Sequence, residues 1–191
     1  EDYRKAFGGI SVQQTFGKNW LAKLSTFGQT NRNNELRPFN ILQEKNHYLG
    51  LRSVVEKKYI AGKTTRRLII GNEFFTENYR WQTLQNNNRT AGNLLTDNEE
   101  FRSYNNVFIL ADLNFRQRVQ LSASLNWNQT SYRYNDHFRS DGDQGGKQAF
   151  DPVVSPRLAA NWKATEKLSL FAVVSHGFSP PTLEETLMPG G

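Results

Sequence analysis

Apolar and polar residues alternate without exception along residues 118–128. The apolar positions are Val119, Leu121, Ala123, Leu125 and Trp127, and the positions between them are Gln120, Ser122, Ser124 and Asn126. Because successive side chains of a β-strand point to opposite faces, this segment predicts a strand with one apolar and one polar face. The same period recurs in residues 157–163 and 168–175, which predict two further strands.

The alternation is looser nearer the N-terminus. Segments around residues 8–14, 20–24, 49–55, 68–82 and 107–113 bring the predicted total to about eight strands. In residues 68–82 the phase changes, because Phe75, Tyr79 and Trp81 have the parity of Gly71 rather than that of Leu68. A β-bulge would produce such a change, so we expect a bulge there, and the side that Trp81 faces stays open.

The links between these strands alternate in length. Short links are expected at residues 15–19, 58–63, 114–117 and 164–166, and long polar loops at 28–45, 84–103 and 135–152. Outer-membrane barrels have short periplasmic turns and longer extracellular loops. The predicted strand 115–134 also exceeds the roughly five or six residues of a globular strand. These features predict an all-β fold, an antiparallel up-and-down transmembrane β-barrel.

Three tryptophans agree with this fold. Trp20 and Trp162 have apolar parity beside predicted short turns, and Trp127 has it near the other end of its strand. Aromatic girdles of transmembrane barrels occupy these two levels.

Composition excludes several other classes. A mean hydropathy of −0.70 leaves no room for a run of 18 apolar residues, so no transmembrane helix is expected. The chain has no cysteine for a disulfide or a thiolate metal site. Its net charge of +6 is spread along the chain without a dense basic block, which predicts a mildly basic surface and no nucleic-acid partner.

No catalytic or metal-binding pattern is present in the sequence. His47, His137 and His176 lie far apart without a second ligand at useful spacing. Residues 140–146 contain an Asp-x-Asp pair but lack the remaining calcium ligands, so they predict a flexible loop. A nucleophile motif such as G-x-S-x-G is missing. We therefore expect no enzyme, no cofactor and no bound metal.

The C-terminal part of the chain, FDPVVSPRLAANWKATEKLSLFAVVSHGFSPPTLEE (150–185), resembles the barrel of TonB-dependent outer-membrane receptors. A Ser-Pro-Arg opens one strand, and after a short turn and a second strand a Gly-Phe-x-x-Pro element precedes a Glu. These residues are Ser155, Pro156 and Arg157, followed by Gly177, Phe178, Pro181 and Glu184. Residues 34–40 and 68–74 resemble receptors of the ferric-citrate or ferric-siderophore type more weakly.

The resemblance implies a receptor in the bacterial outer membrane that takes up a ferric chelate or another scarce small ligand, with energy from the inner-membrane TonB complex. Such receptors are barrels of about 22 strands with a plugged lumen. Neither a plug domain nor an energy-coupling box is found here, so residues 1–191 are expected to be an internal part of the barrel domain. Outer-membrane lipid is the other expected partner. His176 and Ser179 replace residues that are commonly basic in relatives, so their contacts are not carried over.

Five residues after Trp127 are the candidate ligand contacts: Tyr132, Arg133, Tyr134, His137 and Arg139. They combine aromatic faces with cationic donors at the expected outer rim, which suits an anionic chelate or a sugar. An ordinary solvated loop is the alternative. Arg157 and Glu184 are instead expected to be structural residues that face the lumen.

Two other kinds of protein remain open at this point. A complete barrel of about eight strands with a structural or adhesive role would match the strand count. A soluble β-sandwich binding module is the third alternative, and long strands with an apolar exterior count against it.

Overall fold

A computed structural model describes residues 2–142 and 144–177 of the chain. Over these residues it contains nine strands and one short 3-10 helix: β1 (Asp2–Phe16), β2 (Trp20–Leu36), β3 (Asn40–Ala61), β4 (Thr64–Asn87), β5 (Thr90–Phe115), β6 (Val119–Asp136), η1 (Arg139–Asp141), β7 (Gly146–Ala149), β8 (Val153–Lys163) and β9 (Ser169–Ser175).

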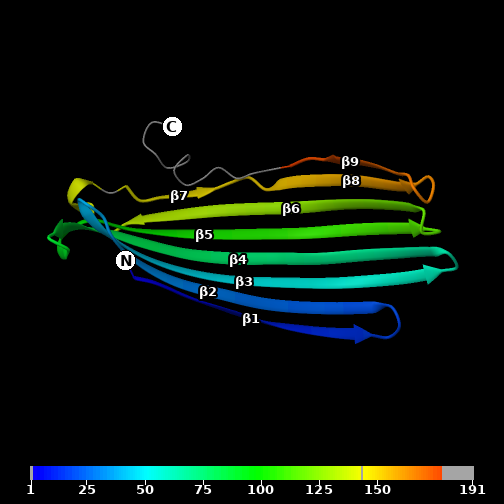
Figure 1. Cartoon of the computed structure of the whole chain (residues 1–191), viewed down its shortest axis with the longest axis horizontal. Coiled ribbons are helices and arrows are strands. Elements are labelled where there is room, and N and C mark those ends of the chain that lie inside the picture. Colours follow the sequence, from blue (N-terminus) through cyan, green and yellow to red (C-terminus); the bar gives the residue numbers. More distant parts are fainter. Residues whose placement is uncertain (1, 143, 178–191) are drawn as a thin grey trace.

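The strands form one antiparallel up-and-down sheet (Figure 1). Its order is β1-β2-β3-β4-β5-β6-β8-β9, and the short strand β7 pairs with the far end of β6. The predicted all-β barrel-wall fold is confirmed, with β7 as the strand that the sequence did not predict. Within the described residues β1 and β9 do not pair with each other, so these strands form an open sheet and not a closed eight-stranded barrel.

The short turns lie together at one end of the sheet. Residues 17–19, 62–63, 116–118 and 164–168 connect successive strands there, close to the predicted short links. In the turn after β5, Arg116 and Gln117 both have positive φ, at 53° and 56°. The Asn114 side chain accepts a hydrogen bond from the Gln117 backbone N–H at 3.1 Å. Such a pair of left-handed residues matches the twist of a two-residue hairpin turn.

Two of the three predicted long loops are wrong. Strands β2 and β3 are joined by residues 37–39 alone, and β4 and β5 by Asn88 and Arg89, because the polar segments continue as paired strands. Polar composition suggested loops, but a strand with water on both faces can carry polar residues on either face, and its backbone is satisfied by its neighbours. The segment between β6 and β8 does contain a loop, which carries η1 and β7.

The predicted β-bulge in residues 68–82 is also wrong. β4 pairs with β3 in unbroken register from Thr64 to Gln85, and its register to β5 shifts only near Leu84. Phe75, Tyr79 and Trp81 therefore lie on the face opposite Leu68 because the strand itself places them there.

The two faces of the sheet differ in chemistry. We call the face of Leu121 and its in-register partners the outer face, and the face of Ser122 and its partners the inner face. On the outer face, residues 107–115 of β5 lie beside residues 119–127 of β6. Val107 is opposite Trp127 at one end, and Phe115 is opposite Val119 at the other. Every outward residue between these limits is apolar.

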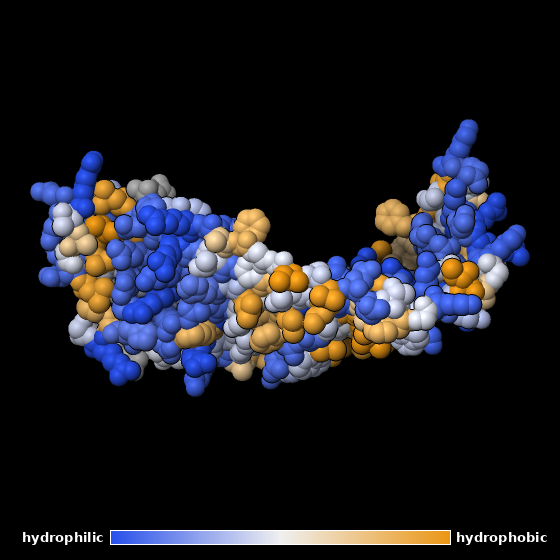
Figure 2. Space-filling model, turned by 90° about the horizontal axis from the view of Figure 1, so that it is seen from below, coloured by the Kyte–Doolittle hydropathy of each residue, from blue (hydrophilic) through white to orange (hydrophobic). Residues whose placement is uncertain are grey.

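This outer-face apolar band has the dimensions of a membrane-spanning strand. Nine residues per strand agree with the roughly nine to eleven that a tilted β-strand needs to cross a bilayer. Trp20 and Trp162 lie at the short-turn limit of the band and Trp127 at its other limit, as predicted. Figure 2 shows hydrophobic residues gathered near the middle of the molecule, whereas the end at the left is mainly hydrophilic.

Beyond the band, β2 to β6 continue with mainly polar residues on their outward positions, with apolar exceptions that include Ile41, Leu84 and Phe101. Strand β5 alone has 26 residues, so more than half of it lies beyond Val107. No helix among the described residues is long and apolar enough to cross a membrane.

Candidate functional site

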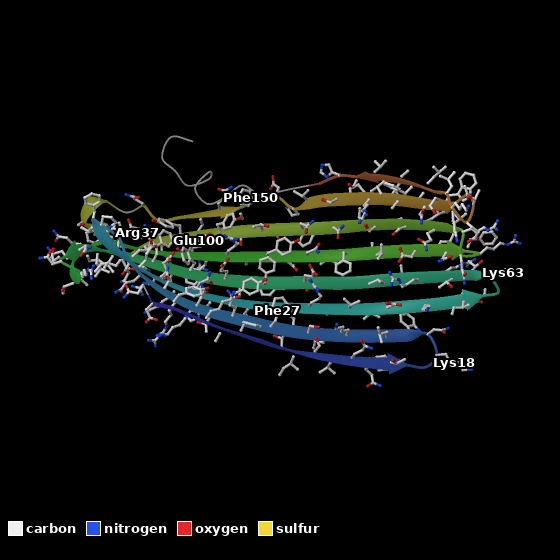
Figure 3. The ribbon with its side chains drawn as sticks, in the orientation of Figure 1. Lys18, Phe27, Arg37, Lys63, Glu100 and Phe150 are labelled. Atoms are coloured by element: carbon white, nitrogen blue, oxygen red, sulfur yellow. The ribbon has the colours of Figure 1, made fainter. Side chains whose placement is uncertain are left out.

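The inner face carries a row of aromatic rings just beyond the level of the apolar band. Ring centroids are 5.9 Å apart for Phe27 and Tyr48, 5.3 Å for Tyr48 and Phe75, and 4.7 Å for Phe75 and Tyr104. These residues come from four successive strands, β2 to β5, and Phe27 is labelled near the middle of the sheet in Figure 3. Contacting aromatic rings at these separations stabilise one another and present a continuous apolar surface.

A second aromatic group lies further from the band on the same face. Tyr79 and Trp81 of β4 stack at 5.1 Å, and Trp81 is 5.9 Å from Tyr134 of β6. We call Tyr79, Trp81 and Tyr134 the aromatic triad. All three side chains are partly exposed, so a molecule that moves along the inner face can touch them.

Glutamates lie between the aromatic rings on the inner face. Glu73 pairs with Arg52, and Arg102 lies 3.6 Å from both Glu77 and Glu100. The Tyr79 hydroxyl donates to Glu44, which also accepts from the Asn33 amide at 2.8 Å. Carboxylates thus outnumber guanidinium groups in this part of the wall.

Burial perturbs two of these ionisable groups. Glu100 is 8% exposed, and burial raises the pKa of its carboxyl, with the nearby Arg102 opposing the shift. Burial also raises the pKa of the Tyr79 hydroxyl, and its hydrogen bond to Glu44 acts in the same direction. Tyr79 therefore stays protonated at neutral pH and acts as a hydrogen-bond donor.

The five predicted ligand residues divide between the two faces. Tyr132 and Tyr134 belong to β6 and face inward, whereas Arg133 faces outward with its guanidinium 5.0 Å from the Phe101 ring. Tyr132 is 6% exposed, with Arg102 over its ring and Phe150 against it edge-on at 5.6 Å. Its burial indicates a packing role.

The loop after β6 brings the other four predicted residues together. Arg133, Tyr134, His137 and Arg139 line one open hollow of about 500 Å³. The His137 ring nitrogen Nε2 lies 3.1 Å from Glu99 Oε2, which ties the start of the loop to β5. The structure therefore places these residues at the rim opposite the short turns. Their contact with a ligand remains a prediction.

The remaining sequence candidates are dispersed. Arg157 lies on the inner face of β8, as expected, and Glu184 falls outside the described residues. His47 is exposed on the outer face of β3, whereas His137 lies in the loop after β6. Over residues 2–142 and 144–177, no group of three or more histidine or acidic side chains could hold a metal ion.

The inner-face aromatic groups were not predicted as a site. The signal for them is present in residues 75–81 of β4. The aromatic residues of this segment all face inward, whereas its outward residues, Thr76, Asn78 and Arg80, are all polar. An inversion of polarity between the two faces, with unbroken strand length, indicates a wall that has left the membrane and keeps its aromatic residues on the lumen side.

An open antiparallel sheet with an apolar outer band, short turns at one end and long polar extensions at the other is the wall of an outer-membrane β-barrel. The family model described as TonB dependent receptor-like, beta-barrel, matches residues 2–191. The chain therefore belongs to the TonB-dependent receptor β-barrel family and is a protein of the bacterial outer membrane. No curated protein sequence matches it.

Solved structures of receptors have the same fold. The alcaligin outer-membrane receptor FauA from Bordetella pertussis superimposes with a TM-score of 0.75 at 7% identity, over 90% of this chain and 28% of that one. The ferric citrate transporter FecA gives 0.70 at 10% identity, over 91% and 27%. The siderophore receptor PiuA from Acinetobacter baumannii gives 0.69 at 11% identity, over 88% and 31%.

At these identities the likeness establishes the fold. The chain spans 27% to 31% of the length of these three receptors.

Proposed function

We propose that this chain is part of the barrel wall of a receptor that takes up a ferric chelate, and that a plug domain elsewhere in the same receptor couples this uptake to the inner-membrane TonB complex. The family supports uptake at the outer membrane. Receptors of similar fold are named for ferric citrate, ferric yersiniabactin and siderophores. This support gives the class of ligand but not its identity.

The observation that carries the proposal is the aromatic inner face beyond the apolar band. The interior face of a barrel wall is in general polar, so partly exposed rings on this face are an exception that ligand contact would explain. Partly exposed rings such as those of the aromatic triad bind flat or apolar parts of a ligand, and tyrosine and tryptophan add hydrogen-bond donors. We propose that the triad contacts the chelate as it enters the lumen.

The charges of this wall bear on how the ligand is held. Glu44, Glu73, Glu77 and Glu100 lie among the rings, with Arg52 and Arg102 as their cationic partners. An anionic chelate gains little from such a surface. We therefore infer that aromatic packing, more than charge, holds the ligand against this part of the wall, and that Arg139 and His137 act at the rim.

The test is iron uptake by cells that depend on the intact receptor. Radioactive iron is supplied as ferric citrate, as a ferric catecholate or as a ferric hydroxamate, and the complex that the wild type transports is then used for the variants. Replacement of Tyr79, Trp81 and Tyr134 together by alanine is expected to lower uptake at least tenfold, because three ring contacts are lost.

The matched control is Phe101→Ala, which removes a ring at a similar level on the outer face. This variant should transport like the wild type. Loss of TonB should abolish uptake by every variant. A triple variant that reaches the outer membrane and still transports at the wild-type rate contradicts the role of the triad, and a receptor that transports none of the three complexes contradicts the proposed function.

A further inference from the structure

Three glutamates lie around Tyr79 on the inner face, beyond the apolar band. Glu44 is on β3, Glu77 on β4 and Glu100 on β5. The register places Tyr79 opposite Glu100, and the Tyr79 hydroxyl donates to Glu44. Glu100 is labelled in Figure 3 toward the end of the sheet that lies away from the short turns. We call Glu44, Glu77 and Glu100 the inner carboxylate cluster.

A single guanidinium group accompanies the inner carboxylate cluster. Arg102 lies 3.6 Å from Glu77 and 3.6 Å from Glu100, which is beyond the length of an ordinary hydrogen bond. Glu44 makes no ion pair within the described part of the chain. Three carboxylates thus share one cation, so the cluster carries an excess of negative charge.

Other cations near the cluster have partners of their own or lie apart from it. Arg52 pairs with Glu73, and Arg37, in the turn after β2, lies 2.9 Å from Glu35. Lys5 faces inward on β1, three strands away from β4, which is about 14 Å at the usual strand spacing. The excess negative charge is therefore left for a cation from outside this part of the wall.

Buried acceptors without donors give a second, independent indication. Glu100 is 8% exposed, and its Oε1 atom has no hydrogen-bond partner among the described residues. The side-chain oxygens of Asn31 and Asn46, which the register places in the same row as Tyr79 and Glu100, also lack a donor there. Buried acceptors without a partner are costly. This row is therefore short of hydrogen-bond donors as well as of positive charge.

Aromatic faces lie beside these acceptors. Trp81 stacks on Tyr79 at 5.1 Å, and Tyr134 is opposite Glu100 in the register of β5 and β6. The electron-rich face of a tyrosine or tryptophan ring attracts an ammonium group. Rings, carboxylates and unpartnered acceptors thus favour the same kind of group, a cation with several N–H donors.

The position of the cluster indicates where such a cation comes from. The cluster borders the aromatic triad, which the proposed function assigns to ligand contact, and Glu44 and Glu77 are only half-buried. A group carried by the chelate therefore reaches these carboxylates when the chelate packs against the triad. A lysine or arginine from another part of the receptor has the same chemistry, and the experiment separates the two sources.

We propose that the inner carboxylate cluster binds an ammonium group of the ferric chelate, so that the receptor favours a chelate with a cationic arm over a purely anionic one. Glu44 and Glu100 accept hydrogen bonds from the ammonium group, while the rings of Tyr79 and Trp81 pack against the arm that carries it. This inference rests on the proposed function and adds to it the charge of the ligand.

The test uses the intact receptor and two forms of one ligand. The first form is ferric iron bound by a linear trihydroxamate with a free terminal amine, and the second is the same complex with that amine acetylated. Acetylation removes the positive charge and leaves the iron centre unchanged. Dissociation constants are measured by calorimetry on receptor purified in detergent. The wild type is expected to bind the amine form at least about tenfold more tightly, the scale of hydrogen bonds to charged groups.

The variant Glu44→Gln with Glu100→Gln should lose most of this preference, because the carboxylates that distinguish the two forms are absent. The matched control is Glu56→Gln with Glu166→Gln, which removes two carboxylates nearer the short turns, from β3 and from the turn before β9. The control should keep the preference of the wild type. If the first variant fails to assemble, Glu44→Gln alone should still lower the preference at least about threefold.

Several outcomes would overturn the proposal and leave the proposed function intact. Equal binding of the two forms by the wild type is one, and uptake of ferric citrate or of a ferric catecholate in preference to both forms is another. A preference that falls equally in the control would show a general charge effect. If the Glu44 and Glu100 variant loses stability but keeps the preference, the cluster pairs with a cation of the receptor itself. Failure of the proposed function is a different result, in which the receptor takes up no ferric complex at all.

Discussion

The ring of Phe27 on β2 covers the backbone of Gly50 on β3. The two residues are paired in register on the inner face, and a Cβ atom at position 50 would lie 2.3 Å from the Phe27 Cζ atom. Glycine is therefore required at this position by the ring above it and not by a turn. The ring in turn stacks against Tyr48 at 5.9 Å, so it cannot move aside without loss of that contact.

Gly50→Ala is expected to destabilise the intact receptor by about 1–3 kcal/mol, the usual cost of overpacking. The measurement is the midpoint of urea unfolding in detergent. Gly8→Ala is the control, because nothing lies within 4 Å of the position of its Cβ atom. The double variant Phe27→Ala with Gly50→Ala should be more stable than the sum of the two single changes predicts, since the clash is absent. Additive effects would contradict this account of Gly50.

The turn between β5 and β6 offers a stabilising change. Gln117 has a φ of 56°, a left-handed conformation that costs a non-glycine residue roughly 1 kcal/mol. Gln117→Gly should raise the free energy of unfolding by about 0.5–1 kcal/mol, because glycine adopts this conformation without the Cβ penalty. Gly62, at a φ of 57°, gives the opposite control, since Gly62→Ala should destabilise. If both changes shift the unfolding midpoint in the same direction, backbone conformation is not the cause.

The ion pair of Arg80 and Asp97 predicts a pH dependence beyond the apolar band. Asp97 is 6% exposed, and although burial opposes its ionisation, hydrogen bonds from Arg80 and Gln82 hold the pKa of its carboxyl below the ordinary value. A lowered carboxyl pKa means that the folded state binds this proton less tightly than the unfolded state. The resulting stability is present above the ordinary pKa of 3.8 and is lost as the pH falls through the lower folded value.

Asp97→Asn should therefore destabilise the receptor by about 2 kcal/mol at pH 7, the scale of hydrogen bonds to a charged group. Its unfolding midpoint should also change less between pH 5 and pH 3 than that of the wild type. The exposed pair of Lys163 and Glu166, 2.8 Å apart, supplies the control. Glu166→Gln should have little effect at pH 7, because exposed ion pairs contribute little. A similar loss in both variants would argue against a special role for Asp97.

The membrane-spanning part of the fold could be predicted from the sequence, and the part beyond it could not. In β6, water on one face and hydrocarbon on the other leave an alternation that has one interpretation. Beyond Val107 both faces meet water, so in β5 polar residues occupy both faces and the alternation no longer separates a strand from a loop. Residues 84–103 appeared to form a loop for this reason, although only the Asn88 and Arg89 turn interrupts the strands.

The candidate site shows the same limit. Tyr134 was predicted from its mixed aromatic and basic surroundings, but its ring partner Trp81, and Tyr79 which stacks on Trp81, are more than fifty residues earlier in the chain. Only the register of β4, β5 and β6 brings them to one face. Because Trp81 does not have the apolar parity of Leu68, the sequence suggested a bulge in place of an inner-face aromatic group and left the side that Trp81 faces open.

Glu100 supplies a prediction of opposite sign to Asp97. Its Oε1 atom has no hydrogen-bond partner among the described residues, and the nearest guanidinium nitrogen, Arg102 Nη2, lies 3.6 Å away. Burial raises the pKa of this carboxyl above 4.5, so the folded state binds the proton more tightly than the unfolded state. The contribution of Glu100 to stability is thus most favourable below pH 4.5 and declines as the pH rises through the folded value. Glu100→Gln removes the charge and keeps the shape.

We expect Glu100→Gln to stabilise the intact receptor by about 1 kcal/mol at pH 7, since a buried carboxylate whose Oε1 atom accepts no hydrogen bond is costly, and Arg102 at 3.6 Å offsets only part of that cost. The gain should shrink toward zero as the pH is lowered to 4, where the wild-type carboxyl is itself protonated. Glu73→Gln is the matched control on the same face, and it should not stabilise, because Glu73 makes a closer ion pair with Arg52 than Glu100 makes with Arg102. Urea unfolding at pH 4, 5.5 and 7 measures both. A gain for Glu100→Gln that is constant across this range would mean that ionisation of Glu100 is not its source.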